Sequence, residues 1–399
     1  HTRSLCDWSS DVCSSDLKGV GDGGDITLTG SSINLNQATT TAQTSGSGNG
    51  GTITVNADSL SLGQGATLTT KTEFTSVNEP VKDAQGNPLK DNNGKPIIIP
   101  ANNGITGKAG DISIFSDTVG LSGGATINAQ TSTIGDGGTI TIKAPGSANL
   151  GLNISDQSEI TASTSLQKKP DDTSLIKDPA IQQAKGGNIV IGNTESVLNI
   201  TGGGKITVET KGVGDGGDIT LTGSSINLNQ ATATAQTSAS GKGGTITVNA
   251  NSLTLDHGAQ LNTMTTKVAT GKGGEINLNA NTISLSNNAI ATAATEGAGV
   301  GGTIHVETGA LNIDSGATLS TKAFNKGNAG MILINTGINS GDLNVSIDPD
   351  GRKNSSITAK TEYKDLALGN NSYQQAAGGL ISLGNGKNSI NVKIGRAHV

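Results

Sequence analysis

Aromatic side chains and cysteines are scarce in this chain of 399 residues. Phe, Tyr and Trp together make up 2% of it, with 2 cysteines and 1 tryptophan. A compact core built around large aromatic rings is therefore excluded. The 59 glycines favour a chain that buries small β-branched and aliphatic side chains in thin layers.

Clustered positive charge and long apolar runs are also missing. The chain carries 26 basic and 32 acidic residues, for a net charge of -6. This balance gives no polybasic surface for nucleic acid or anionic lipid. No apolar run approaches the roughly 20 residues of a membrane-spanning helix. We therefore expect no nucleic-acid partner and no membrane span in this chain.

Both ends of the chain look foreign to it. The codons AAG ATC GGA AGA GCA CAC GTC encode Lys393–Val399, and their reverse complement encodes Asp11–Leu17. Such an inverted match resembles a translated sequencing adapter. We therefore interpret residues 1–17 and 393–399 as adapter-like, non-native segments. The remainder has no cysteine, no tryptophan and no initiating Met, so we expect an internal fragment without a disulfide framework.

One short phrase recurs throughout the chain: two small residues, a spacer, then apolar, polar and apolar residues. Its base period is close to 28 residues, as from Gly273 to Gly301, and three steps are longer. A fixed period of this length is the signature of a stacked-repeat architecture. The copies are Gly23–Leu28, Gly50–Val55, Ala109–Ile114, Gly137–Ile142, Gly186–Ile191, Gly216–Leu221, Gly243–Val248, Gly273–Leu278, Gly301–Val306, Ala329–Ile334 and Gly378–Leu383.

Each repeat contains three short alternating runs. In Gly50–Thr70 the apolar pairs are Ile53/Val55, Leu60/Leu62 and Ala66/Leu68. Period-two alternation of this length predicts strands with one buried face, and the glycine- and asparagine-rich segments between them predict tight corners. The sequence therefore predicts an all-β right-handed parallel β-helix over residues 18–392, with three short strands per coil and about eleven coils. At roughly 4.8 Å per coil the rod is about 50 Å long.

The strand phase predicts which side chains stack inside the coil and which face water. Thr, Ser and Asn take the outward positions, and Gly or Asn is expected at corners that need a left-handed backbone. The predicted first-face column consists of Ile26, Ile53, Ile112, Ile140, Ile189 and Ile219.

The sequence also contains a repeat much longer than one coil. Lys18–Thr39 and Lys211–Thr232 are identical, with an offset of 193 residues (211 minus 18). A recent duplication explains this identity, and so does misassembly of repetitive reads.

Three insertions enlarge the repeat, at residues 73–106, 165–185 and 361–377. Each follows the third run of its coil, so all three leave the solenoid at the same edge. Insertions that gather on one face of a solenoid often form its contact surface. Phe74, Tyr363 and Tyr373 are the candidate contact residues of this edge. The alternative is that these are bulges without a role, which solenoid surfaces tolerate.

Catalytic chemistry has little support in the residues. Outside the adapter-like ends there is one arginine, Arg352, and the adjacent pair Asp171–Asp172 lies in an insertion, where solvated loop charges are the favoured interpretation. A polysaccharide-cleaving site needs converging carboxylates or a base, usually beside aromatic rings. We therefore expect no catalytic residues and no cofactor.

Metal binding is also expected to be absent. His257 and His305 have no ligand partner at useful spacing, and His305 should point outward from its strand. Asp348–Gly351 is typical of a tight turn, with calcium coordination as the alternative. The pairs Asp22/Asp25 and Asp215/Asp218 flank corner glycines and leave the same calcium alternative open.

The recurring G-x-G-G-x-I-x-L corner, followed by S-L-x-L and G-A-x-L-x-T runs, resembles the repeat region of filamentous-haemagglutinin-like exoproteins over residues 18–392. This resemblance implies a β-helical shaft, export through an outer-membrane two-partner secretion transporter, and adhesion at the surface of a Gram-negative bacterium. The implied partners are glycans or proteins of a host or neighbouring cell surface or matrix. It transfers no catalytic residue, and fold-level likeness alone does not establish function.

Two hypotheses of different class follow, with a third behind them. The first is a non-catalytic adhesin shaft, secreted or held at the cell surface. The second is a β-helical carbohydrate-active enzyme, a polysaccharide lyase or hydrolase, which predicts a lateral groove with at least three converging charged groups. The third is a passenger domain of another secretion type.

Overall fold

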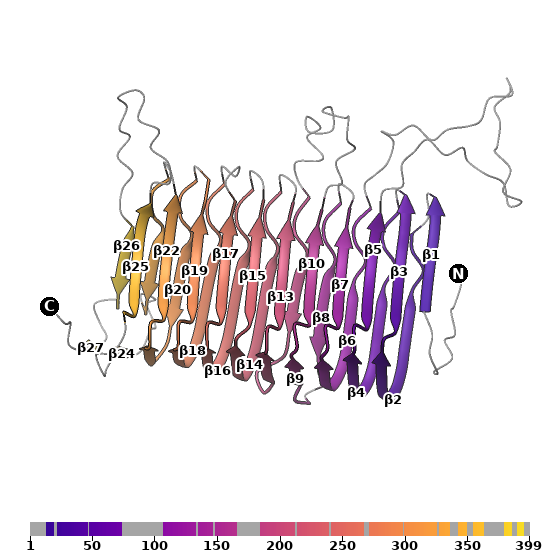
Figure 1. The fold of residues 1–399 in the computed structure, drawn as a ribbon, viewed down its shortest axis with the longest axis horizontal. Helices are drawn as coiled ribbons and strands as arrows, with labels where there is room; N and C mark the ends of the chain where they lie inside the picture. Colours follow the sequence, from indigo (N-terminus) through magenta and orange to yellow (C-terminus); the bar gives the residue numbers. More distant parts are fainter. Residues whose placement is uncertain are drawn as a thin grey trace, which may run out of the picture.

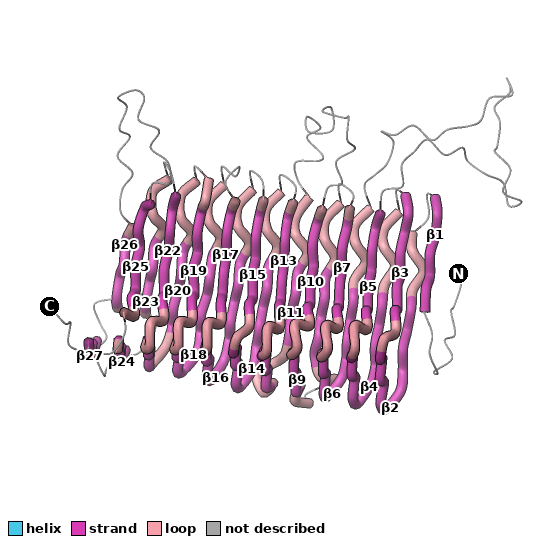
Figure 2. The backbone as a smooth tube through the Cα atoms, in the orientation of Figure 1, coloured by secondary structure: helices cyan, strands magenta, loops and turns pink. Residues whose placement is uncertain are grey.

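The computed structural model shows a parallel β-solenoid whose strands run across its long axis (Figure 1). The structure describes residues 13–19, 22–46, 48–73, 107–132, 135–146, 148–165, 184–211, 214–238, 241–266, 271–297, 299–324, 327–335, 342–348, 354–362, 379–384 and 389–394. Within these ranges every strand pairing is parallel and there is no helix, as the alternating runs predict (Figure 2). The described residues thus contain no helix with the length and hydropathy to cross a bilayer.

The third runs of successive coils form one 11-stranded sheet, which we call the third face. Its strands lie in sequence order along the solenoid axis (Figure 1). They are β1 (Cys13–Gly19), β3 (Thr39–Gly46), β5 (Thr67–Glu73), β7 (Thr126–Thr131), β10 (Glu159–Thr164), β13 (Lys205–Thr210), β15 (Thr232–Thr237), β17 (Gln260–Thr265), β19 (Ile290–Thr295), β22 (Thr318–Phe324) and β25 (Ser356–Glu362).

The first and second runs form a 16-stranded sheet. Where the two runs are separate, the strands are β8 (Thr139–Lys143) and β9 (Gly151–Ile154), β11 (Asn188–Ile191) and β12 (Val197–Thr201), β20 (Thr303–Glu307) and β21 (Ala310–Ile313), β23 (Met331–Ile334) and β24 (Leu343–Ile347), and β26 (Leu380–Leu383) and β27 (Ile390–Ile394). Where they merge, the strands are β2 (Ile26–Asn36), β4 (Ile53–Gly63), β6 (Ile112–Leu121), β14 (Asp218–Asn229), β16 (Thr245–Asp256) and β18 (Glu275–Leu285).

These merged strands correct the expectation of three separate strands in every coil. Pairing of β2 with β4 resumes directly after the corner: Gly30 pairs with Ala57 and Ser32 with Ser59, and only Ser31 and Asp58 between them are unpaired. The coil number is also slightly below eleven: among the described residues, the third-face strands other than β1 close ten coils.

The predicted isoleucine column is confirmed. Ile26 pairs with Ile53, Ile53 with Ile112, and Ile112 with Ile140, and the column continues through Ile189 to Ile219. Each of these side chains is at most 1% exposed. Inward positions of all three runs join in one continuous apolar core along the axis. The strand phase read from the alternation is therefore correct.

The corners between the second and third runs need a left-handed backbone at more than glycine. Gly65 and Gly258 have φ of 77° and 75°, and the preceding Gln64 and His257 have φ of 50° and 49°. The sequence predicts Gly or Asn at such positions, whereas in these two corners Gln64 and His257 occupy the first of two consecutive left-handed positions. Such residues adopt this region at an energetic cost, which the stacked coils on either side sustain.

The corner between the third face and the next first run, which we call the glycine corner, has a different requirement. Its second small residue is glycine in every copy of the repeat, whereas the first is replaced by Ala109 and Ala329. A Cβ on these second glycines, from Gly51 to Gly379, would lie 1.7–2.3 Å from a carbonyl oxygen of the preceding coil. Close approach of two backbones, and not a left-handed φ, therefore requires glycine here.

We expect Gly244→Ala to destabilise the solenoid by about 1–3 kcal/mol, the usual cost of forcing extra volume into a packed site. Its Cβ would meet the Gly217 oxygen at 1.9 Å. Gly120→Ala is the matched control, because a Cβ there meets nothing within 4 Å. Urea unfolding of both variants measures the difference. Equal stability of the two variants would contradict the close-approach explanation.

Candidate functional site

The described residues that flank the three insertions lie at one edge of the solenoid. The insertions follow β5, β10 and β25, which all belong to the third face, and the next described residues are Gly107, Ala184 and Gly379 at the glycine corner (Figure 1). The strands reach slightly beyond the predicted insertion boundaries, since Glu73 belongs to β5 and Thr361–Glu362 to β25. Ser165 and Lys185 likewise lie among the described residues. The candidate contact residues Phe74, Tyr363 and Tyr373 lie outside the described residues, as does Asp171–Asp172.

A groove of about 610 Å³ runs along the glycine corner. The glycine backbone of successive coils forms part of the groove lining, because these positions have no side chain to fill the space. Charged residues of both signs also line it: Lys108, Asp111, Asp136, Lys185, Asp215, Asp218 and Lys242. The sequence analysis does not predict this groove. Its charged residues are nevertheless recognisable in the sequence, because they lie directly before or after the pair of small residues in each repeat.

Aspartate and asparagine side chains in the groove connect one coil to the next. Asp215 Oδ1 accepts a hydrogen bond from the Lys242 N–H at 2.9 Å, and Asp218 Oδ1 accepts one from the Thr245 N–H at 3.1 Å. Asp22 and Asp25 act in the same way toward the N–H groups of Asn49 and Thr52, at 2.7 and 3.0 Å. The aspartates that raised the calcium alternative are therefore acceptors for the backbone of the following coil.

The threonines at the position of Asp218 show what happens without such an acceptor. Thr245 takes this position in the next coil, and there the Glu275 N–H donates to the Gly244 carbonyl at 3.1 Å instead. Between the coils of Asn188 and Asp218 the acceptor is again a side chain, since Asn188 Oδ1 accepts from the Asp218 N–H at 3.3 Å. Every backbone donor named here is satisfied, but by two different acceptors.

Buried threonines secure the same corner from inside. The Thr237 hydroxyl donates to the Lys242 carbonyl at 2.7 Å, and the Thr295 hydroxyl donates to the Val300 carbonyl at 2.8 Å. The stacked threonines at this inward position are Thr44, Thr72, Thr131, Thr164, Thr210, Thr237, Thr265 and Thr295, all at most 2% exposed. The hydroxyls of Thr164 and Thr265 have no hydrogen-bond partner, so they do not contribute to this connection. The stacked threonines can be recognised in the sequence, because the period-two alternation of inward and outward residues continues past the aliphatic residues of the third run.

The carboxylates of the groove are spread along the solenoid. Asp136 and Asp215 occupy equivalent positions in their coils, but the coil between them has Lys185 at this position. Asp111 and Asp218 share a second equivalent position, and the two coils between them have Thr139 and Asn188 there. Neighbouring strands are about 4.8 Å apart, where like charges oppose pairing. The described part of the chain contains no group of three His, Cys, Asp or Glu residues placed to hold a metal ion.

The two internal histidines lie at the surface of the solenoid. His305 is outward on β20, as expected, with its Nε2 3.5 Å from Glu275 Oε1. His257 Nδ1 lies 2.6 Å from Asp256 Oδ2 at a left-handed corner. Burial by itself raises the pKa of the Asp256 carboxyl, but hydrogen bonds from Ser286, Asn287 and His257 outweigh it, so the pKa is below its usual value.

Asp348 is the one residue of the Asp348–Gly351 turn that the structure describes. Its Oδ1 accepts from the Ser355 hydroxyl at 2.7 Å and the Ser315 N–H at 3.0 Å, and its Oδ2 accepts from the Ser355 N–H at 2.7 Å. Burial by itself raises the pKa of this carboxyl, but the bonds from Ser355 and Ser315 outweigh burial and lower it. The carboxylate thus connects two coils through local bonds.

No family model matches the chain, and neither a curated protein nor a solved structure matches it. The residues themselves therefore carry the functional argument.

We expect Asp218→Leu to cost about 1 kcal/mol, the net value of one hydrogen bond, because the Thr245 N–H loses its side-chain acceptor. Asp218→Asn keeps an Oδ1 acceptor, as Asn188 does in the preceding coil, and should cost less than half as much. Denaturant titration of both variants measures this. Equal losses would show that the charge matters and the acceptor does not.

Acid should destabilise the wild type more than Asp348→Asn. The folded pKa of Asp348 is below the unfolded value of about 3.9. Its contribution is therefore fully present above that value and is lost as the pH falls through the folded pKa. Melting temperatures measured from pH 7 to pH 3 should begin to converge below about pH 4. Parallel profiles for the two proteins would contradict this assignment.

Proposed function

We propose that the chain forms part of the non-catalytic shaft of a large adhesin, of the filamentous-haemagglutinin-like kind that its repeat resembles. In this proposal the protein is secreted or held at the surface of a Gram-negative bacterium. An outer-membrane two-partner secretion transporter exports it, and its ligands are glycans or proteins of a host or neighbouring cell or of the matrix.

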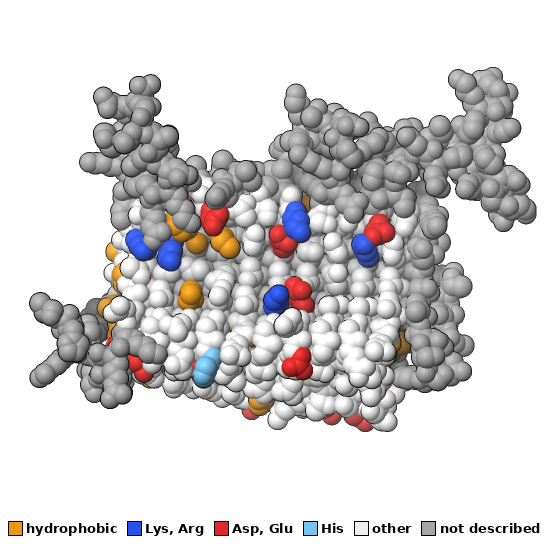
Figure 3. Space-filling model, viewed as in Figure 1, with side chains coloured by type: hydrophobic (Ala, Val, Ile, Leu, Met, Phe, Trp, Pro, Cys, Tyr) orange, Lys and Arg blue, Asp and Glu red, His pale blue; other side chains and the backbone are white. Residues whose placement is uncertain are grey.

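One observation carries the proposal: the same coil, in the same register, repeats along the whole described length. The third face is mostly uncharged and polar, with a few charged side chains, some of them in pairs of opposite sign (Figure 3). The four aspartates of the groove each accept a hydrogen bond from a backbone N–H, so the coil needs no catalytic role to account for them. A rigid rod that bears insertions along one edge is suited to hold contacts away from a cell.

A carbohydrate-active enzyme is the second candidate, and the groove is the observation that favours it. Its four aspartates and three lysines exceed the three charged groups that this hypothesis requires. However, the aspartates alternate with other residues on successive coils, and each uses its Oδ1 for a backbone N–H. Residues arranged in this way do not converge on a single scissile bond.

Two assays of the purified chain separate the candidates. We expect saturable binding to cultured cells or matrix-coated plates, and no shortened or unsaturated product from a panel of polysaccharides. Product formed by the wild type and abolished in Asp136→Asn or Asp215→Asn would establish the enzyme instead. Absence of binding to every cell and matrix surface would overturn the adhesin proposal.

A further inference from the structure

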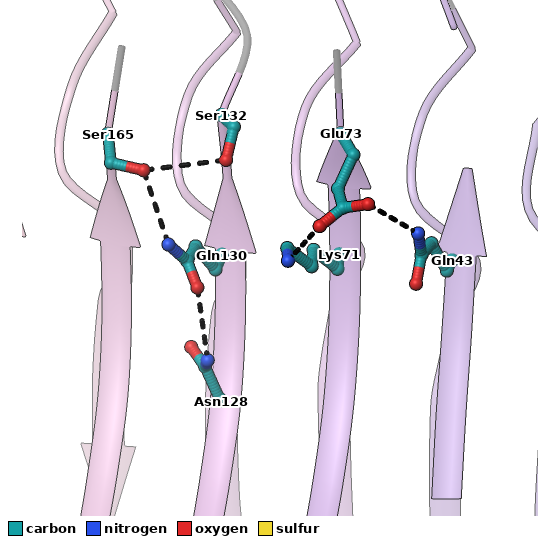
Figure 4. A network of polar contacts seen from close by, with 7 residues as sticks. All are labelled: Gln43, Lys71, Glu73, Asn128, Gln130, Ser132 and Ser165. Atoms are coloured by element: carbon teal, nitrogen blue, oxygen red, sulfur yellow. Dashed lines mark hydrogen bonds and ion pairs between the residues drawn. The ribbon is translucent and has the colours of Figure 1, made fainter. Parts of the chain in front are cut away.

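Between the roots of the first two insertions, the third face carries a cluster of amide, hydroxyl and paired charged side chains. We call it the amide patch: Gln43 on β3, Lys71 and Glu73 on β5, Asn128 and Gln130 on β7, and Ser165 just after β10 (Figure 4). Four adjacent strands present it, so it spans roughly 14 Å across three strand spacings. These side chains are half-buried, which leaves part of each one accessible, although Asn128 Oδ1 is itself buried and has no hydrogen-bond partner.

Hydrogen bonds hold these side chains in place. Gln43 Nε2 donates to Glu73 Oε2 at 2.8 Å, and Lys71 forms an ion pair with the same carboxylate. On the neighbouring strands Gln130 Nε2 donates to Ser165 Oγ at 3.2 Å, while Asn128 Nδ2 donates to Gln130 Oε1 at 3.3 Å (Figure 4). The main chain beneath is fixed as well, because the Ser165 N–H donates to the Thr131 carbonyl at 2.7 Å. Groups on packed strands hold their geometry better than groups on loops.

The chemistry of the patch selects among ligand classes. Lys71 and Glu73 neutralise each other, so the patch has no charge excess to attract a polyanion. Its side chains are all polar, whereas protein interfaces usually depend on buried aromatic or aliphatic anchors. What remains is a row of side-chain donors and acceptors without net charge. Hydroxyl groups both donate and accept, so a ligand rich in hydroxyls matches such a row.

We infer that the amide patch binds a neutral saccharide. The sugar hydroxyls donate to Glu73 and to the Gln43 and Gln130 amide oxygens, and they accept from the Gln43 and Gln130 amide nitrogens. The inference rests on the proposed adhesin function, because it gives that function a ligand class and a contact site on the solenoid itself. Binding without an aromatic platform is weak for each site, and many copies at a cell surface raise its avidity.

The test is a binding titration of the full chain, by ligand-observed NMR, with three neutral probes and one anionic probe: maltotetraose, chitotetraose, lacto-N-tetraose and a heparin tetrasaccharide. We expect at least one neutral probe to bind. Gln43→Ala and Gln130→Ala should each weaken it about tenfold, since each removes a hydrogen-bonding amide.

Gln236→Ala is the matched control. Gln236 occupies the same row of the third face as Gln43 and Gln130, on β15 and outside the patch. This variant should bind the neutral probe within twofold of wild type. Circular dichroism of all three variants checks that the solenoid is intact.

Three outcomes would overturn the inference: no neutral probe binds, only the heparin fragment binds, or Gln236→Ala weakens binding as much as Gln130→Ala does. Cell adhesion of the Gln43→Ala/Gln130→Ala double variant separates this inference from the proposed function. Adhesion at the wild-type level would reject the patch and leave the adhesin proposal standing. Failure of the wild type to adhere to any surface would reject the adhesin proposal itself.

Discussion

The approach of one backbone to the next at the glycine corner is the constraint on which the solenoid depends. Each second glycine leaves room for a carbonyl oxygen of the preceding coil where any side chain would collide with it. That contact sets the rise between coils at one edge, and the isoleucine columns then stack at the same rise. Apolar burial supplies most of the favourable free energy of such a core, but the small residues decide whether the coils can come close enough to bury it.

The polar residues at this corner solve a problem that the glycines create. Backbone without side chains is open to water, and its N–H groups need acceptors in the adjoining coil. Aspartate and asparagine oxygens and glycine carbonyls share this task in different coils, whereas buried threonine hydroxyls donate to carbonyl groups of the corner. Spacing the aspartates so that they do not stack on neighbouring coils limits repulsion along the rod. The aspartates that suggest calcium-binding turns in the sequence thus accept hydrogen bonds that connect successive coils.

Alternation made the fold predictable from the sequence, because a period of two fixes which side chains enter the core. The same reasoning placed Ile26 and Ile219 in one column, although they are far apart in the chain. The polar network was not predictable in this way. Asp215 and Lys242 lie one coil apart, and nothing in their local sequence shows that a carboxylate reaches a backbone N–H of the next coil. The left-handed backbone at Gln64 and His257 was not predicted, because backbone propensity favours glycine or asparagine at such corners.

In the two identical segments, Lys18–Thr39 and Lys211–Thr232, β2 and β14 end at equivalent residues, Asn36 and Asn229, and β14 begins one residue earlier than β2. Each coil takes its shape from its own residues and from the coils directly beside it. The distance between the copies corresponds to a whole number of turns, so joining one copy to the end of the other keeps the inward and outward faces aligned. Genetic exchange between such stretches lengthens or shortens the rod in complete turns, and every product inherits a core that already fits.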